Sequence, residues 1–400
     1  MTSATVTTPG ALHRFTEGLP RPYWFLWAGL LINRTGSFIV PLMTVYLTRE
    51  RGLSLIDAGG ILALYGVGSL GGTTLGGWLA DRIGRRSTLL LSLVSASFVM
   101  VLTGQARELS HIAALVFLLG FCADLFRPAS QALVADLVTP EFRVKAFGTQ
   151  YWAINLGFAF AALVGGFVAR SGFQVLFFAD AATTLICAAV IFAGIPETRP
   201  AGGAHAKQEG SLLTPFFDPK FAPFLLLSYV TAFVFMQHLT SLPKDMTDKG
   251  LGPEAFGIAL SANGVLIVLL QPLVLKAVTA GGRGKALGFG AVLTGIGFGL
   301  TAFATVLPLF VLSVAVWTLG EIVMAPVNST VVAERSPAHL RGRYQGAFGL
   351  TWSLAVVTAP VISPRLIAVT GLSVFWGVCF LVCAVAGLGY VLALPDAKRA

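Results

Sequence analysis

Residues 77–86 read Gly-Trp-Leu-Ala-Asp-Arg-Ile-Gly-Arg-Arg and form a short polar segment between two long apolar stretches. A carboxylate at the end of one helix, a turn at a glycine and an arginine cluster at the start of the next helix can pair across the two helix ends and interact with the helix dipoles. We therefore predict a latch here that holds one conformation of the protein. The candidate residues are the glycines and the charged side chains of the segment: Gly77, Asp81, Arg82, Gly84, Arg85 and Arg86.

The 400 residues around this segment are too apolar for a soluble protein. Hydrophobic residues make up 56% of the chain and charged residues 11%, whereas soluble domains carry about 25% charged residues. Long apolar runs with 45 Gly and 20 Pro favour helices over the alternating strands of a β-barrel. The sequence therefore predicts an all-α, polytopic membrane protein.

The apolar runs divide into twelve predicted transmembrane helices. A helix needs about 20 apolar residues to cross the hydrocarbon core, and we place the boundaries at prolines, glycines and charge clusters. The predicted spans are 22–48, 55–80, 87–105, 110–136, 142–170, 173–195, 219–245, 253–278, 284–304, 307–333, 341–368 and 371–394.

The positive charges predict the topology. An even number of spans puts both termini on one side, and 18 of the 27 Lys and Arg residues fall in segments on that side, against 6 on the other and 3 inside spans. Because Lys and Arg are retained in cytoplasmic loops, we expect both termini in the cytoplasm. The net charge of +9 then reflects topology, and no nucleic-acid partner is expected. All four cysteines lie in apolar runs, so we expect neither disulfides nor a metal site.

One long polar connection divides the chain into two halves. Residues 196–218 include Pro200 and a Gly-Gly pair and predict a cytoplasmic linker. On this basis residues 1–195 form an N-terminal six-helix bundle and residues 219–400 a C-terminal one.

The two halves repeat each other at an offset of 198 residues. The matched residues are Pro128 and Pro326, Asp136 and Glu334, Arg143 and Arg341, Gly148 and Gly346, and the pairs Gly84-Arg85 and Gly282-Arg283. Because each unit has six helices, both copies have the same orientation in the membrane. Parallel repeats of this kind place a substrate site between the halves near the membrane midplane and give alternating access. We therefore add four of these repeated charged residues to the latch candidates: Asp136, Arg143, Glu334 and Arg341.

Residues 77–86 resemble the signature loop of the major facilitator superfamily, Gly-x-x-x-Asp-x-x-Gly-Arg-Arg/Lys, and match it completely. The counterpart of Asp81 in the second half is Thr279. Together with twelve spans and a central linker, the resemblance covers the whole chain. It implies two parallel six-helix repeats and a monomeric protein. It also implies a location in a bacterial cell membrane.

Two further stretches, 124–157 and 320–353, look like the twelve-helix drug:proton antiporters of that superfamily. In that group an acid at the position of Glu321 takes part in proton coupling and in binding cationic or lipophilic drugs. The fifth span departs from the antiporter pattern, because Ala161-Ala162-Leu163-Val164 precedes Gly165-Gly166 where a Gly-Pro is expected. The direction of transport is therefore a separate question from the fold.

Four ionisable residues lie near the middle of predicted spans: Arg34, Asp124, Arg127 and Glu321. A charge at mid-membrane costs about 2.5 to 3.5 kcal/mol on insertion scales, so each is a functional candidate. Asp124 and Arg127 share a helix face and either neutralise each other or serve proton coupling and substrate binding. Arg34 is either a counter-charge to an acid or the anchor for an anionic group of the substrate.

Glu321 is the main candidate for proton coupling. Its repeat equivalent is Ala123, next to Asp124, so we expect the two acids to face one cavity. Desolvation favours the neutral form of a carboxyl group and allows it to bind and release a proton near neutral pH. The alternative is a buried interhelical hydrogen bond.

Three further side chains are candidate substrate contacts. Trp152 and Trp352 follow the repeated arginine clusters at near-equivalent places, where they can stack on flat or cationic ligands. His238 is either a proton relay or, as for most lone histidines, a hydrogen-bonded packing residue. Asp180 lies near one end of its span and is expected at the membrane interface.

Three functional hypotheses follow. The first is proton-coupled export of lipophilic, drug-like molecules, with protons and membrane lipids as partners. The second is uptake of a small anionic metabolite through Arg34 and Arg127. The third is a non-transporting membrane protein on the same scaffold. An enzyme is not expected, because the five histidines are scattered and no catalytic constellation is visible. No cofactor is expected either: an ATP-binding Gly-x-x-x-x-Gly-Lys-Ser/Thr loop is absent from the sequence, which leaves a proton gradient as the energy source.

Overall fold

The computed structural model describes residues 16–198, 213–278, 282–337 and 340–394, and in these residues it contains helices and no strands. Twelve stretches of helix in this part of the chain are long and apolar enough to cross a membrane. Their bounds lie within a few residues of those predicted from the sequence. The prediction of a twelve-span helical membrane protein is confirmed.

The first half supplies six spans. They are α2 (Arg21–Thr35) with α3 (Ile39–Val45) and a π-helical turn (Tyr46–Glu50), α4 (Leu55–Ile83), α5 (Arg85–Gln105), α6 (Leu109–Asp124) with α7 (Phe126–Leu137), α8 (Arg143–Val168) and α9 (Phe173–Gly194).

The second half repeats this order after the short helix α10 (Thr214–Phe217). Its spans are α11 (Ala222–Phe235) with α12 (Gln237–Thr240) and α13 (Leu242–Asp248), α14 (Pro253–Val278), α15 (Arg283–Leu300), α16 (Leu307–Arg335), α17 (Arg341–Thr370) and α18 (Leu372–Ala393). The predicted linker at 196–218 lies mostly outside the described residues, so the exact division of the chain stays a prediction.

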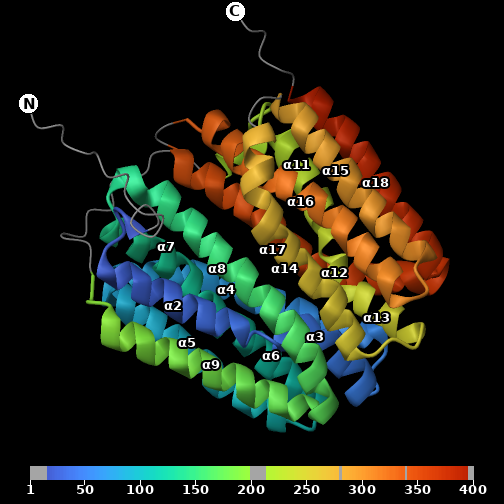
Figure 1. Ribbon diagram of the computed structural model, residues 1–400, viewed down its shortest axis with the longest axis horizontal. Helices are drawn as coiled ribbons and strands as arrows, with labels where there is room; N and C mark the ends of the chain where they lie inside the picture. The colour runs from blue at the N-terminus through green and yellow to red at the C-terminus, as the bar shows by residue number, and fades with distance from the viewer. Residues whose placement is uncertain (1–15, 199–212, 279–281, 338–339, 395–400) are drawn as a thin grey trace, which may run out of the picture.

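The two halves lie side by side, with the helices of the first half on one side of the molecule and those of the second half on the other (Figure 1). The described chain begins and ends at the same end of the bundle, which we call the terminal end; the opposite end is the far end. Two helix pairs join the halves, α8 with α14 and α4 with α17.

Contacts between the halves are found toward the far end. Thr44 donates to the Leu239 carbonyl at 2.7 Å, and Arg170 pairs with Glu254 at 2.7 Å. Toward the terminal end, a Cβ added to Gly148 of α8 would have no neighbour within 4 Å in the described structure, and the same holds for Gly346 of α17. The hydrogen bond and the ion pair named here, which connect the two halves, therefore lie at the far end.

Among the described spans, three are interrupted. The first breaks between Thr35 and Ile39, where a Cβ on Gly36 would lie 1.9 Å from the Thr183 hydroxyl of α9. The second is interrupted at Leu125, where Pro128 has no N–H to donate to the carbonyl of Asp124, although the equivalent Pro326 lies within the continuous helix α16. The third, α11 to α13, breaks at Met236 and again at Ser241, just before a proline. We did not predict these breaks, because the few polar residues beside each of them lie inside runs that are otherwise long and apolar enough to form one span.

Candidate functional site

A cavity of about 280 Å³ lies mainly in the second half, between α11, α15, α16 and α17, with α8 of the first half contributing one wall. Its lining is mostly apolar with a few polar side chains, as in most small-molecule sites. The lining residues are Tyr151, Ser228, Thr231, Ala232, Phe235, Thr294, Glu321, Met324, Ala325, Asn328, Phe348 and Trp352.

Glu321 is the one acidic residue in that lining. Its carboxylate accepts a hydrogen bond from the Asn263 amide of α14 at 2.8 Å, and in the described part of the chain it forms no ion pair. A carboxylate that faces an apolar cavity without a cation beside it is costly, and taking up a proton or a cationic ligand removes that cost. The structure therefore places Glu321 at a cavity and gives it the interhelical hydrogen bond that we had considered as the alternative. The expectation that Glu321 and Asp124 face one cavity was wrong, because Asp124 lines a separate cavity in the first half.

Aromatic side chains form one wall of this cavity. Trp352 meets Phe235 edge to face at 5.6 Å, and Phe235 in turn meets the buried Trp317 at 5.3 Å. Such rings offer broad apolar faces and attract cations placed over them. Trp352 thus lies where the sequence predicted it, and the wall suits a flat or cationic lipophilic ligand.

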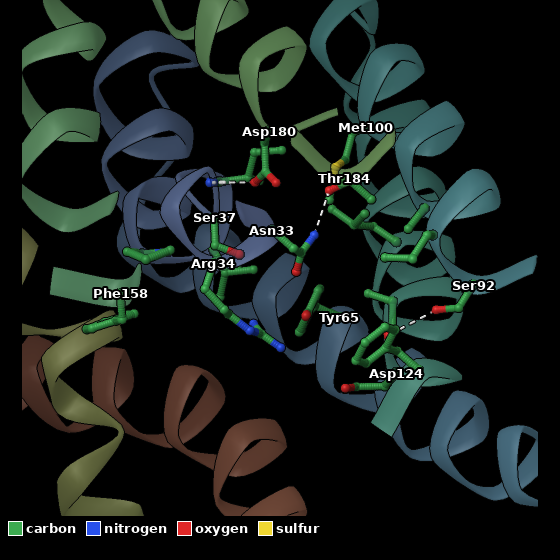
Figure 2. A pocket seen from close by; sticks show the side chains of 18 of the residues that line it. Asn33, Arg34, Ser37, Tyr65, Ser92, Met100, Asp124, Phe158, Asp180 and Thr184 are labelled. Carbon is green, nitrogen blue, oxygen red and sulfur yellow. Dashed lines mark hydrogen bonds between the residues drawn. The ribbon is translucent and has the colours of Figure 1, made fainter. Parts of the chain in front are cut away.

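A second cavity, of about 180 Å³, lies in the first half beside the break in the first span (Figure 2). Arg34, at the end of α2, points into it, and its buried Nε has no hydrogen-bond partner. Tyr65 and Asp124 line the same cavity, to the right of Arg34 in this view. The cavity is polar and holds charges of both signs, in contrast to the cavity of Glu321.

Asp180 is not at the membrane interface, and that expectation was wrong. It is 2% exposed and lines the first-half cavity, where Oδ2 accepts a hydrogen bond from the backbone N–H of Ile39 at 3.3 Å. Ile39 is the first residue of α3, so Asp180 satisfies a donor that the break in the first span leaves without a helical partner. Counting from the span end missed this role, because it depends on a break in another helix.

Asp124 and Arg127 do not pair with each other in the described structure. Asp124 instead accepts a short hydrogen bond from the Ser69 hydroxyl of α4. Arg127 is exposed, whereas Asp124 is half-buried and lines the first-half cavity. A spacing of three residues on the span therefore does not bring the two charges into contact here.

Two other predicted substrate contacts lie outside both cavities. Trp152 is 39% exposed and lines neither cavity, whereas its neighbour Tyr151 lines the cavity of Glu321. His238 is buried, bonds through Nδ1 to the Phe235 carbonyl at 2.6 Å and packs against Trp317. The geometry of His238 matches the packing alternative.

At the terminal end, Arg85 links three helices of the first half. Its guanidinium lies 2.8 Å from the Asp81 carboxylate and 3.2 Å from that of Asp136, and it donates to the Ala80 carbonyl at 2.6 Å. The predicted pairing is present, and all of these partners lie in the first half. The role of this cluster in holding one conformation stays a prediction.

The second half contains the equivalent ion pair. Arg283 and Glu334, each 198 residues after Arg85 and Asp136, lie 3.0 Å apart. The repeat seen in the sequence is therefore also a repeat of contacts. Arg143 caps the end of α7 by donating to the carbonyls of Ala135 and Val138, at 2.7 and 3.2 Å; its counterpart Arg341 has a side chain outside the described part of the structure.

The other two arginines of the segment bind aromatic rings. Arg82 lies over Trp78 at 4.9 Å, and Arg86 lies over Phe192 at 4.5 Å while donating to the Phe192 carbonyl at 2.6 Å. Arg86 thereby ties the start of α5 to the end of α9.

The two glycines of the latch segment differ in what they tolerate. Gly84 has φ of 106°, and a Cβ there would lie 2.3 Å from the Glu197 carboxylate, whereas a Cβ on Gly77 would meet only Pro128, at 3.9 Å. We expect Gly84→Ala to lower the free energy of unfolding by at least about 1–2 kcal/mol through left-handed strain alone, and Gly77→Ala to be neutral or stabilising. Thermal unfolding of the two purified variants tests this, and equal midpoints would contradict it.

Glu197 belongs to this cluster, although the sequence analysis did not single it out. It accepts hydrogen bonds from the backbone N–H groups of Arg86 and Ser87, at 3.0 and 2.9 Å, and from the Ser87 hydroxyl at 2.5 Å. An acid directly after the sixth span, at the start of the linker, was the available signal. The carboxylate caps the N-terminus of α5, where negative charge is favourable.

These contacts predict a pH-dependent stability. Partial burial works to raise the pKa of Glu197, but the hydrogen bonds from Ser87, Arg86 and Thr198 outweigh it, so the pKa lies below its ordinary value. A lowered folded-state pKa means that the carboxylate stabilises the fold above the unfolded-state pKa, about 4.3, and that this contribution is lost as the pH falls through the folded-state value. We expect Glu197→Gln to unfold at a lower temperature than the parent at pH 7, and the difference to shrink below about pH 4. Glu108→Gln, at an exposed far-end position, is the control; a difference that does not change with pH would contradict the assignment.

Comparisons with known proteins agree with this architecture. A family model described as Major Facilitator Superfamily matches residues 26–245 and 239–400, and so spans both halves. Among solved structures, a peptide transporter of the POT family in complex with sulfate superposes with a TM-score of 0.80 at 17% identity, covering 97% of this chain and 98% of that one.

Three bacterial proteins illustrate the range of relatives. An uncharacterized transporter of Bacillus subtilis, YttB, is 30% identical over 82% of this chain and 84% of its own. A Na⁺, Li⁺, K⁺/H⁺ antiporter of Planococcus maritimus is 25% identical over 83% and 86%. The quinolone resistance protein NorA of Staphylococcus aureus is 24% identical over 59% and 61%.

Proposed function

The chain belongs to the major facilitator superfamily of transporters, and from this premise we propose that it exports lipophilic, drug-like molecules in exchange for protons. The observation that carries the proposal is Glu321, a carboxylate that faces a largely apolar cavity with a hydrogen bond from Asn263 and no ion pair in the described structure. Such a group can bind either a proton or a cationic substrate, and this competition couples the two.

The cavity around Glu321 supports a lipophilic substrate. Its volume of about 280 Å³ and its aromatic wall at Trp352 and Phe235 suit a flat or cationic molecule. One relative is named a quinolone resistance protein and another a cation/H⁺ antiporter. Both names are consistent with proton-driven export.

The arrangement of the halves supports alternating access. The halves are joined at the far end by the Thr44–Leu239 hydrogen bond and the Arg170–Glu254 ion pair. We take the terminal end as cytoplasmic because most Lys and Arg residues lie on that side, and we propose that this conformation opens toward the cytoplasm. Closing the terminal end while opening the far end exposes the cavity to the other side. The Arg85 cluster is proposed to stabilise one of these two conformations.

The experiment that tests the proposal uses proteoliposomes loaded with a pH-sensitive dye. Adding the lipophilic cation tetraphenylphosphonium should drive proton movement in the opposite direction, and an imposed proton gradient should drive movement of the cation. If neither flux exceeds that of empty liposomes across a panel of cationic and neutral lipophiles, the proposed function fails.

Uptake of a small anionic metabolite is the second candidate. It is favoured by Arg34, whose buried Nε has no partner and whose side chain points into the polar first-half cavity (Figure 2). Arg127 no longer supports it, because Arg127 is exposed and lines neither cavity. Accumulation of carboxylates under an inward proton gradient distinguishes uptake from export.

A further inference from the structure

Asn263 of α14 holds two groups of α16 with one amide nitrogen. Its Nδ2 donates to the Glu321 carboxylate at 2.8 Å and to the Thr318 hydroxyl at 3.1 Å. The Thr318 hydroxyl donates to the Val314 carbonyl of its own helix, so its oxygen is oriented to accept from Asn263. Both N–H groups of the amide are thereby used, and Asn263 is 5% exposed.

The helix that carries Asn263 also joins the two halves. A Cβ added to Gly264, the next residue, would lie 2.7 Å from the Asn155 carbonyl of α8, and a Cβ added to Gly257 would lie 2.2 Å from the Ala162 carbonyl. Because the two backbones are this close, α14 cannot shift unless α8 shifts with it. A change in the hydrogen bonds between α14 and α16 therefore also changes the contact between the halves.

The first half repeats this arrangement. Asp124 on its fourth span accepts from Ser69 on its second span, as Glu321 on the tenth span accepts from Asn263 on the eighth. The residue 198 positions before Asn263 is Tyr65, which lines the cavity beside Asp124. In each half the second helix thus bonds the acid and also packs across to the other half, α4 on α17 and α14 on α8.

We propose that Asn263 is a positioning residue that responds to the charge on Glu321 and transmits it to the contact between α14 and α8. This inference rests on the proposed proton coupling at Glu321 and names the residue that converts proton binding into movement. A hydrogen bond to an ionised carboxylate is about twice as strong as one to a neutral group, so proton binding weakens the link between α14 and α16. Conversely, the amide stabilises the ionised form of Glu321.

The surroundings of Glu321 contain few competing charges. Of the residues that line its cavity, Tyr151 of α8 is the one other titratable side chain, and α11, α15 and α17 contribute apolar, hydroxyl or indole groups. The neighbouring His238 packs against Trp317, one turn before Glu321. Asn263 is thus the described side chain that responds most directly to the charge state.

The test measures conformation against pH without any substrate. Spin labels at Thr74→Cys on α4 and Gln345→Cys on α17, both exposed, report the separation of the halves at the terminal end; the four native cysteines are buried. In the parent, the distance distribution between the labels should change with pH around one midpoint, and Glu321→Gln should abolish that change. Asn263→Leu removes the donor at similar volume, so the midpoint should move upward by about one pH unit, a roughly tenfold gain in apparent proton affinity.

Two further variants make the result specific. Asn328→Leu changes another buried asparagine, 6% exposed, that lines the same cavity, and it should leave the midpoint unchanged. Thr318→Val removes only the second anchor of the amide and should shift the midpoint in the same direction by a smaller amount; it serves as the test if Asn263→Leu does not fold.

The outcomes separate the two proposals. If Glu321→Gln keeps the parental pH response, proton coupling at Glu321 is wrong. If Glu321→Gln loses the response while Asn263→Leu and Thr318→Val keep the parental midpoint, coupling stands and the role of Asn263 is rejected. Equal shifts in Asn263→Leu and Asn328→Leu would also reject it, because they would indicate a general effect of cavity polarity.

Discussion

Glu321→Gln should abolish proton-driven export of tetraphenylphosphonium from proteoliposomes, with a fall in rate of roughly 100-fold or more, as is typical when a positioned proton-transfer group is removed. The carboxamide keeps the size of the side chain but can neither bind nor release a proton. In the parent, the Asn263 amide lies 2.8 Å from the Glu321 carboxylate. In the variant it can donate to the carboxamide oxygen of the new glutamine instead, so we expect the variant to fold. The predicted defect is therefore in coupling and not in stability.

The measurement records both fluxes in one preparation, cation movement by an electrode and proton movement by an internal dye. Glu108→Gln, the same substitution at an exposed far-end position, is the matched control and should behave as the parent. A Glu321→Gln protein that exchanges cation for protons at the parental ratio would show that another group carries the proton. Asp124, bonded to Ser69 in the first-half cavity, is then the next carboxylate to test.

The fold was predictable because its causes are local in the sequence. Span length and hydropathy fix twelve helices, and the offset of 198 residues predicts the duplicated unit. The offset even anticipates contacts, since Arg85–Asp136 and Arg283–Glu334 form equivalent ion pairs. The breaks in the helices were not predicted, because the polar residues beside them were interpreted as functional groups within continuous spans.

The errors in the candidate site concern contacts between helices, which spacing along one helix does not determine. Asp124 and Arg127 were expected to share a helix face, but Asp124 bonds to Ser69 of α4 and Arg127 is exposed. Asp180 was placed by its distance from the span end, whereas its partner, the N–H of Ile39, exists because the first span breaks next to it. Trp152 and Tyr151 are adjacent, and a rotation of about 100° per residue along a helix decides which one faces the cavity. Glu321 does face a cavity, as a lone acid within an apolar span suggests, but the expectation that Asp124 shares this cavity was wrong.

The break in the first span leads to the second large expected effect, at Asp180. This carboxylate is 2% exposed and accepts from the N–H of Ile39 at 3.3 Å, while its other oxygen, Oδ1, is buried without a partner. Asp180→Leu keeps the branched shape of the side chain, although it is larger, but leaves the Ile39 donor unsatisfied and removes the acid that shares a cavity with Arg34. An orphaned buried N–H costs about 1–3 kcal/mol, and losing one of the negative charges in the cavity of Arg34 adds to that cost.

Asp180→Asn separates the two contributions. Its amide oxygen can still accept from Ile39, so the helix break remains capped, but the negative charge near Arg34 is lost. We expect thermal unfolding midpoints in the order parent, Asp180→Asn and then Asp180→Leu, with the largest step at Asp180→Leu. If Asp180→Asn is as unstable as Asp180→Leu, the charge beside Arg34 matters more than the cap. If both variants match the parent, the break in the first span does not depend on Asp180, and the assignment of this buried acid as a helix cap must be abandoned.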